Sequence, residues 1–159
     1  MNCAKKLIPP NVRWTACQGT SLRGGLTRSR CLSGKLALHV ACIPGDLSRL
    51  TQLDQFDAAN ANFEPAMPES KALVMSALHK LLSEESEYLT AFSPDAAGAP
   101  WRLTLRGAEV FSMPRAVMLR SLLLNHWYHH RGQLSVNVRL LDVPVPVIYG
   151  RSADENPFA

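Results

Sequence analysis

The chain has 159 residues, a formal net charge of +4 and an ordinary hydrophobic fraction of 47%. This length predicts a single domain that buries about two-thirds of the surface of its unfolded chain. No apolar run approaches the roughly 20 residues of a membrane-spanning helix, so we expect no membrane partner. The four cysteines form no CxxC pair and follow no secretory signal, which predicts reduced thiols in a cytoplasmic protein.

Residues 1–31 form a basic leader that differs from the rest of the chain. Residues 1–35 hold seven of the 17 Lys and Arg residues and no acid, and the remainder has ten basic residues against 13 acidic ones, or −3. The leader has no helical apolar period, so we predict that it is irregular. Four explanations of this leader are open. It is a misassigned start of the protein, a variant in which a partner chain takes the place of a first helix, a transit peptide, or an arm that binds nucleic acid. We expect no nucleic-acid partner, because Trp14 is the only aromatic residue of the leader.

A helix is predicted from Ser33, which can serve as its N-cap, to about Phe56. His39 lies beside its apolar stripe and is expected to point inward. Pro44 and Gly45 should kink this helix or divide it into two pieces. The residues of the stripe recur at intervals of three and four: Leu36, Val40, Ile43, Leu47, Leu50 and Leu53.

A second helix is predicted after a polar, proline-containing loop at residues 57–70. It begins at Glu69 or Ser70 and ends near Phe92, and His79 lies off its apolar face, so we expect that histidine to be exposed. The apolar face consists of Val74, Ala77, Leu78, Leu81, Leu82 and Leu89.

A short β-hairpin is predicted next. Residues 101–105 alternate with period two, and Arg106 and Gly107 allow a turn before a second strand at residues 110–111. The hairpin would cover one end of the helices. The proline-rich tail from Pro144 onward is expected to wrap around the helices, with Tyr149 as its anchor.

The last helix is predicted from Ser112, with Pro114 in its first turn, to about Asp142. It is apolar on almost every side, which predicts burial all round. One polar stripe interrupts this pattern, at spacings of four, three and four: His126, His130, Gln133 and Asn137. Two histidines at i and i+4 share a helix face and can bind one metal ion. The alternative is a pair of hydrogen-bonded core histidines, and the spacing alone does not decide between them.

Three segments of this region also carry a family resemblance: residues 126–134 (HWYHHRGQL), 138–144 (VRLLDVP) and 148–155 (IYGRSADE). They closely resemble the DinB/YfiT-like family of small four-helix metalloproteins. In that family a third histidine comes from an earlier helix, in a Leu-Ala-x-His-Val/Leu-Ala context, and this chain has LALHVA at residues 36–41. The resemblance covers residues 32–156 and implies a histidine triad of metal ligands: His39, His126 and His130.

The resemblance implies an all-α fold for residues 32–159, a DinB-like up-down-down-up four-helix bundle with a short β-hairpin before the last helix. It also implies a homodimer. Residues 1–31 depart from the family, whose proteins begin with a long amphipathic helix, so the first helix is expected to be missing or irregular. Apolar surface left exposed by a missing helix would favour self-association.

Three neutral imidazoles leave a coordination position open, which is typical of catalytic rather than structural zinc. Zinc or nickel is the expected divalent ion, and iron and copper also suit imidazole ligands. Gln133 is the candidate catalytic residue, because it lies one turn beyond His130 and could hydrogen-bond a metal-bound water or a substrate. Cys42 and Asp46 follow His39 by one and two turns, but packing or solvent exposure suits each better than metal binding.

Other residues near the motif have simpler expected roles. His129 points about 100° away from His130. We therefore expect it to contact a ligand residue or to lie at an interface, and not to bind the metal itself. Arg131 is expected to pair with a carboxylate across the bundle, and Gly132 to let a neighbouring helix approach closely.

Together these features predict a metal-dependent enzyme of the thiol-transferase, isomerase or hydrolase type. Its substrate would be a small molecule, with a low-molecular-weight thiol as the candidate partner that the resemblance implies. The alternative is a non-catalytic metal-binding protein of the stress response, in which the histidine triad is vestigial.

Overall fold

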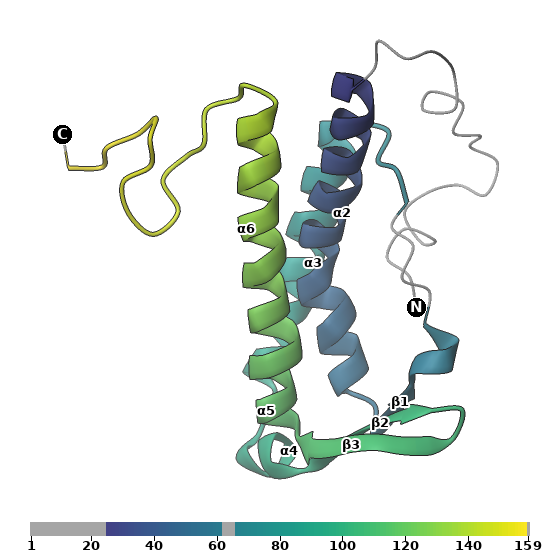
Figure 1. Cartoon of the computed structure of the whole chain (residues 1–159). Helices are drawn as coiled ribbons and strands as arrows, with labels where there is room; N and C mark the ends of the chain where they lie inside the picture. Colours follow the sequence, from purple (N-terminus) through teal and green to yellow (C-terminus); the bar gives the residue numbers. More distant parts are fainter. Residues whose placement is uncertain (1–24, 62–65, 159) are drawn as a thin grey trace.

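The structure, a computed structural model, describes residues 25–61 and 66–158, with side chains from residue 33 onward. Three long helical segments stand side by side (Figure 1), and α2 packs against both of the others. The last of the three is continuous but contains a π-helical stretch, labelled η2. The helical elements are α2 (Gly25–Thr51), α3 (Lys71–Thr90), α4 (Pro94–Gly98), α5 (Arg115–Met118), η2 (Leu119–Leu124) and α6 (Asn125–Leu140), with a short 3-10 turn η1 (Ala58–Asn60).

A three-stranded mixed sheet lies across the end of the bundle where α2 finishes (Figure 1). Strand β1 (Gln55–Asp57) runs parallel to β2 (Pro100–Leu105), and β2 pairs antiparallel with β3 (Ala108–Pro114). Arg106 and Gly107 both have positive φ, 52° and 82°, as a two-residue hairpin turn requires. The predicted hairpin is therefore present, and β1 is a strand that the sequence pattern did not reveal.

The expected all-α fold class is wrong, because the described residues form a mixed structure of helices and a three-stranded sheet. The up-down-down-up four-helix bundle is not what they show, since they contain three long helical segments and the five-residue α4. The physical reason is that β1 has only three residues, too few for an alternating pattern. It becomes a strand only by pairing with β2, where Phe56 lies opposite Leu103.

The sheet is attached to the C-terminal end of α2 by hydrogen bonds to that helix's last carbonyls. The indole Nε1 of the buried Trp101 donates to the carbonyl of Leu50 at 2.9 Å. Arg115 donates from Nε to the carbonyl of Thr51 at 2.9 Å and pairs with Asp54 at 2.6 Å. The last carbonyls of a helix lack intrahelical partners, so these side chains supply them. Trp101 joins α2 to β2, and Arg115 joins α2 to the start of α5.

The tightest packing is between α2 and α3, where a core cluster contains Leu38, Cys42, Ala77 and Leu81. A Cβ placed on Gly45 would lie 2.6 Å from Cδ2 and 2.8 Å from Cβ of Leu81, so only glycine permits this approach of the two helices. The start of α3 follows the prediction, because the Ser70 hydroxyl accepts the N–H of Leu73 at 3.2 Å as an N-cap.

Several predicted boundaries are corrected. Helix α2 begins at Gly25 and ends at Thr51, instead of running from Ser33 to Phe56. Residues 25–31 of the expected irregular leader therefore belong to a helix, and residues 1–24 lie outside the described residues. Ser112 and Pro114 belong to β3, because the strand pairing with β2 continues to the residue before the last helix.

The last helix is not buried all round. Val136 and Leu140 are 58% and 67% exposed, since within the described residues α2 is the long helix that packs along α6. The approach expected at Gly132 is not seen either, because nothing lies within 4 Å of a Cβ placed there.

The C-terminal segment extends away from α6 instead of wrapping around the helices (Figure 1), and Tyr149 is 82% exposed. Asp154 closes the segment into a loop: its carboxylate accepts bonds from the Arg139 guanidinium at 2.8 and 2.5 Å and from the N–H of Val145 at 2.7 Å. The expectation of reduced thiols is wrong for Cys42, which is disulfide-bonded. The lack of a CxxC motif excludes only a disulfide between cysteines that are close in sequence, not one between cysteines far apart in the chain.

Candidate metal centre

The structure brings together the three histidines that were expected as metal ligands. His39 projects from α2, and His126 and His130 project from α6. One ring nitrogen from each lies within 4.8 Å of the other two, and all three residues are half-buried. The ring centre of His39 is 4.6 Å from that of His130 and 5.4 Å from that of His126. The expected pair on one helix is thus completed by a residue from another helix.

The local sequence of α6 explains the pair. His126 and His130 are four residues apart, so their rings lie about one turn apart on the same face. Their Nε2 atoms are 2.7 Å apart, which is hydrogen-bond distance. The π-helical stretch η2 ends just before this turn, at Leu124. A π turn holds more residues than an α turn, so η2 changes which face of the segment His126 occupies relative to the residues before it.

Pro44 explains how α6 is held beside His39. Pro44 was expected to kink α2 or divide it, and the helix is not divided there. Proline has no N–H, so the carbonyl four residues earlier, that of Val40, receives no intrahelical hydrogen bond from it. The indole Nε1 of Trp127 on α6 donates to this carbonyl at 3.0 Å. The bond therefore joins Val40, which follows His39, to Trp127, which follows His126. This bond was not predicted from the sequence, although the proline within the helix indicates that the Val40 carbonyl needs another donor.

Gln133 lies beside the cluster and contacts His130. Its Oε1 is 2.7 Å from Nδ1 of His130. A metal-binding histidine commonly gives its second ring N–H to such an acceptor, which orients the ring. The arrangement places Gln133 behind His130, whereas sequence reasoning expected it to contact a bound water or substrate.

The surroundings of His39 and His126 favour the neutral imidazole. Burial, and then the proximity of His130 and His126, lowers the pKa of His39 from 6.5 to about 4. Burial also lowers the pKa of His126, with smaller contributions from His130 and His129. Each effect disfavours the charged imidazolium. His39 and His126 therefore carry a free nitrogen lone pair at neutral pH, which a metal ligand requires.

The geometry fits a metal ion. Two imidazole nitrogens bound to one tetrahedral ion at about 2.0–2.1 Å lie about 3.3 Å apart. The Nε2 atoms of His126 and His130 are 2.7 Å apart, so a small rotation of the rings would bring them to that spacing. The donor set of three imidazoles suits zinc, nickel, copper and iron alike.

The other candidate residues lie outside this group. His129 is exposed, with its ring centre 5.0 Å from that of His130, and His79 is exposed on α3, as expected. Asp46 pairs with Arg49 at 2.9 Å, and Cys42 belongs to the core between α2 and α3. Neither joins the three-histidine group.

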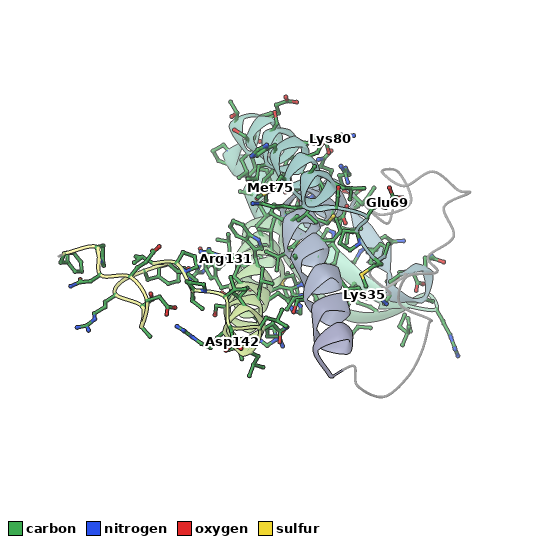
Figure 2. The ribbon with its side chains drawn as sticks, turned by 90° about the horizontal axis from the view of Figure 1, so that it is seen from above. Lys35, Glu69, Met75, Lys80, Arg131 and Asp142 are labelled. Atoms are coloured by element: carbon green, nitrogen blue, oxygen red, sulfur yellow. The ribbon has the colours of Figure 1, made fainter. Side chains whose placement is uncertain are left out.

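Arg131 was expected to pair with a carboxylate, but its guanidinium lies over aromatic rings. It is 5.0 Å from the ring centre of Trp127, 5.9 Å from that of Tyr128 and 5.6 Å from that of Tyr149. Arg131 lies on the side of α6 from which the C-terminal segment extends (Figure 2). Cation–π attraction therefore connects that segment to the helix that carries His130.

One surface depression is separate from the histidines. It is formed by α3 alone and shares no residue with the histidine cluster. Its lining consists of Leu82, Glu85, Ser86, Leu89 and Thr90.

Comparison with known proteins adds no relative: no family model matches the chain, and no curated protein or solved structure matches it significantly. The resemblance to the DinB/YfiT-like family stays a prediction from the motifs. Among the described residues, none of the helices combines the length and the apolar composition that crossing a membrane requires.

Proposed function

We propose that this protein binds one divalent metal ion through His39, His126 and His130. The observation that carries the proposal is the convergence of three ring nitrogens, from two helices, to within 4.8 Å of one another. The lowered pKa values of His39 and His126 support it, because a protonated imidazole cannot ligate. Three protein ligands are the number that catalytic zinc sites use, with a further position left for water or substrate.

We further propose a metal-dependent enzyme of the thiol-transferase, isomerase or hydrolase type that acts on a small molecule. A divalent ion in such a site acidifies a water or thiol bound to it, which is the chemistry that hydrolysis and thiol transfer need. The chain's own residues would hold and orient the ion: the three imidazoles as ligands, Gln133 on the far nitrogen of His130, and Trp127 in joining α6 to α2. The resemblance of the motifs supports zinc or nickel, a low-molecular-weight thiol as substrate, and a homodimer.

The test is metal stoichiometry, measured by elemental mass spectrometry on untagged full-length protein. We expect about one divalent ion per chain in the wild type and a large loss in His39→Ala and His126→Ala. His79→Ala is the matched control, because His79 is an exposed histidine on α3, outside the cluster. If the wild type takes up no ion even after reconstitution with zinc and nickel, the proposal is wrong.

Turnover decides between an enzyme and the non-catalytic alternative. Thiol-dependent consumption of an electrophilic substrate by the metal-loaded wild type, lost in His126→Ala, would support the enzyme. Tight metal binding without turnover against a broad panel of thiols, electrophiles and esters would instead support a metal-binding protein of the stress response.

A further inference from the structure

His130 is hydrogen-bonded through both of its ring nitrogens, and the two partners impose different requirements. Its Nδ1 is 2.7 Å from Oε1 of Gln133, and its Nε2 is 2.7 Å from Nε2 of His126. An amide oxygen can only accept a hydrogen bond. The hydrogen between His130 and Gln133 must therefore be on Nδ1 of His130.

The same hydrogen determines the state of the other nitrogen. A neutral imidazole carries one N–H, so Nε2 of His130 has a lone pair, and this lone pair is directed at the cluster. The hydrogen between the two Nε2 atoms must then come from His126, whose Nε2–H donates to His130. In this arrangement His130 can ligate through Nε2, while His126 is in the opposite tautomer and cannot.

We propose that Gln133 is a positioning residue that fixes His130 in the Nδ1–H tautomer before any metal binds. This prepares Nε2 of His130 as the first ligand. The proposal extends to metal binding, and in that part it depends on the proposed function. To ligate through Nε2, His126 would release its Nε2 proton to water and take up a proton from water at Nδ1. It would then stay neutral, with its Nε2 lone pair free.

The first part is tested by nitrogen NMR on full-length protein with 15N-labelled histidine, made metal-free with a chelator. At about pH 8, where a free imidazole is neutral, His130 should show a protonated, pyrrole-type Nδ1 and a pyridine-type Nε2. His126 should show the reverse pattern. Zinc ions should change the pattern of His126 and leave Nδ1 of His130 protonated. A protonated Nε2 on His130 in the metal-free protein would overturn the proposal, as would protonation of both its nitrogens.

Substitutions at residue 133 provide a second measurement. Gln133→Glu keeps an acceptor and should retain the Nδ1–H tautomer of His130 and the zinc affinity. Gln133→Met keeps the length of the side chain and removes the acceptor, so His130 should populate both tautomers and zinc affinity should fall about 10–100-fold. Asn137→Met is the control, because it removes an amide one turn further along α6 that makes no hydrogen bond to the described histidines.

The outcomes separate the two proposals. If Gln133→Met binds zinc as tightly as the wild type, Gln133 is not a positioning residue, even though the metal site stands. If the wild type binds no zinc, the proposed function fails, and the spectra of the metal-free protein still decide whether Gln133 sets the tautomer of His130.

Discussion

Replacing Gly45 by alanine tests the packing of α2 against α3 directly. The new Cβ would lie 2.6 Å from Cδ2 and 2.8 Å from Cβ of Leu81, both closer than carbon atoms can approach. Leu81 is 2% exposed, so its side chain is enclosed by the protein and cannot turn out into solvent. Overpacking of this kind costs about 1–3 kcal/mol. Alanine regains about 1 kcal/mol of helix propensity, so we expect the free energy of unfolding to fall by up to about 2 kcal/mol.

The assay is urea denaturation followed by circular dichroism, with Gly34→Ala as the matched control. Gly34 is in the same helix, but a Cβ there would meet only Met67 and Pro68 at ordinary contact distances of 3.5 Å or more. Gly34→Ala should therefore stabilise the protein by up to about 1 kcal/mol. In a Leu81→Ala background the cost of Gly45→Ala should shrink, because Cδ2 and Cγ of Leu81 are removed and only its Cβ, at 2.8 Å, remains. If Gly45→Ala stabilises as much as Gly34→Ala, the close approach of the two helices is wrong.

Three further predictions concern the histidine cluster and the sheet. Metal-free protein should lose stability as pH falls from about 6.5 to about 4, because unfolded His39 takes up a proton that the folded residue, with its pKa lowered to about 4, does not. After allowance for solvent screening the loss is about 2 kcal/mol; His39→Gln should flatten this slope in urea titrations, and an unchanged slope would contradict it. Trp127→Phe should lose its bond to Val40, which lowers stability by about 1 kcal/mol and weakens zinc binding in calorimetry; full affinity would refute the role of this bond. Asp57→Ala should speed amide hydrogen exchange at Arg106 and Gly107, whose N–H groups donate to its carboxylate at 3.0 and 2.8 Å; unchanged rates would argue against this contact.

Local sequence patterns predicted much of the secondary structure. Ser70 caps α3 as expected, and the alternation at residues 101–105 forms β2. The turn at Arg106 and Gly107 also follows the prediction. Each of these features depends on residues within a few positions of one another: the cap on one side-chain hydroxyl, the strand on its period, and the turn on a backbone that glycine accepts.

Features that depend on distant partners were not predictable in the same way. β1 exists because residues 55–57 pair with residues 102–104, and three residues carry no period of their own. The exposure of Val136 and Leu140 depends on which helices pack along α6. Apolar composition alone suggested burial on every side.

A helical period of 3.6 residues is enough to place His126, His130 and Gln133 on one face of a helix. The chain also contains the proline that leaves the carbonyl of Val40 without its helical partner. The packing of α6 against α2 was needed to show that Trp127 donates to this carbonyl and that His39 lies beside the other two histidines. The three-dimensional structure was also needed to show that hydrogen bonds link Gln133 to His130 and His130 to His126. The physical reason is that contacts within one helix follow from its repeat, whereas contacts between helices depend on how closely their surfaces can approach, which a residue such as Gly45 controls.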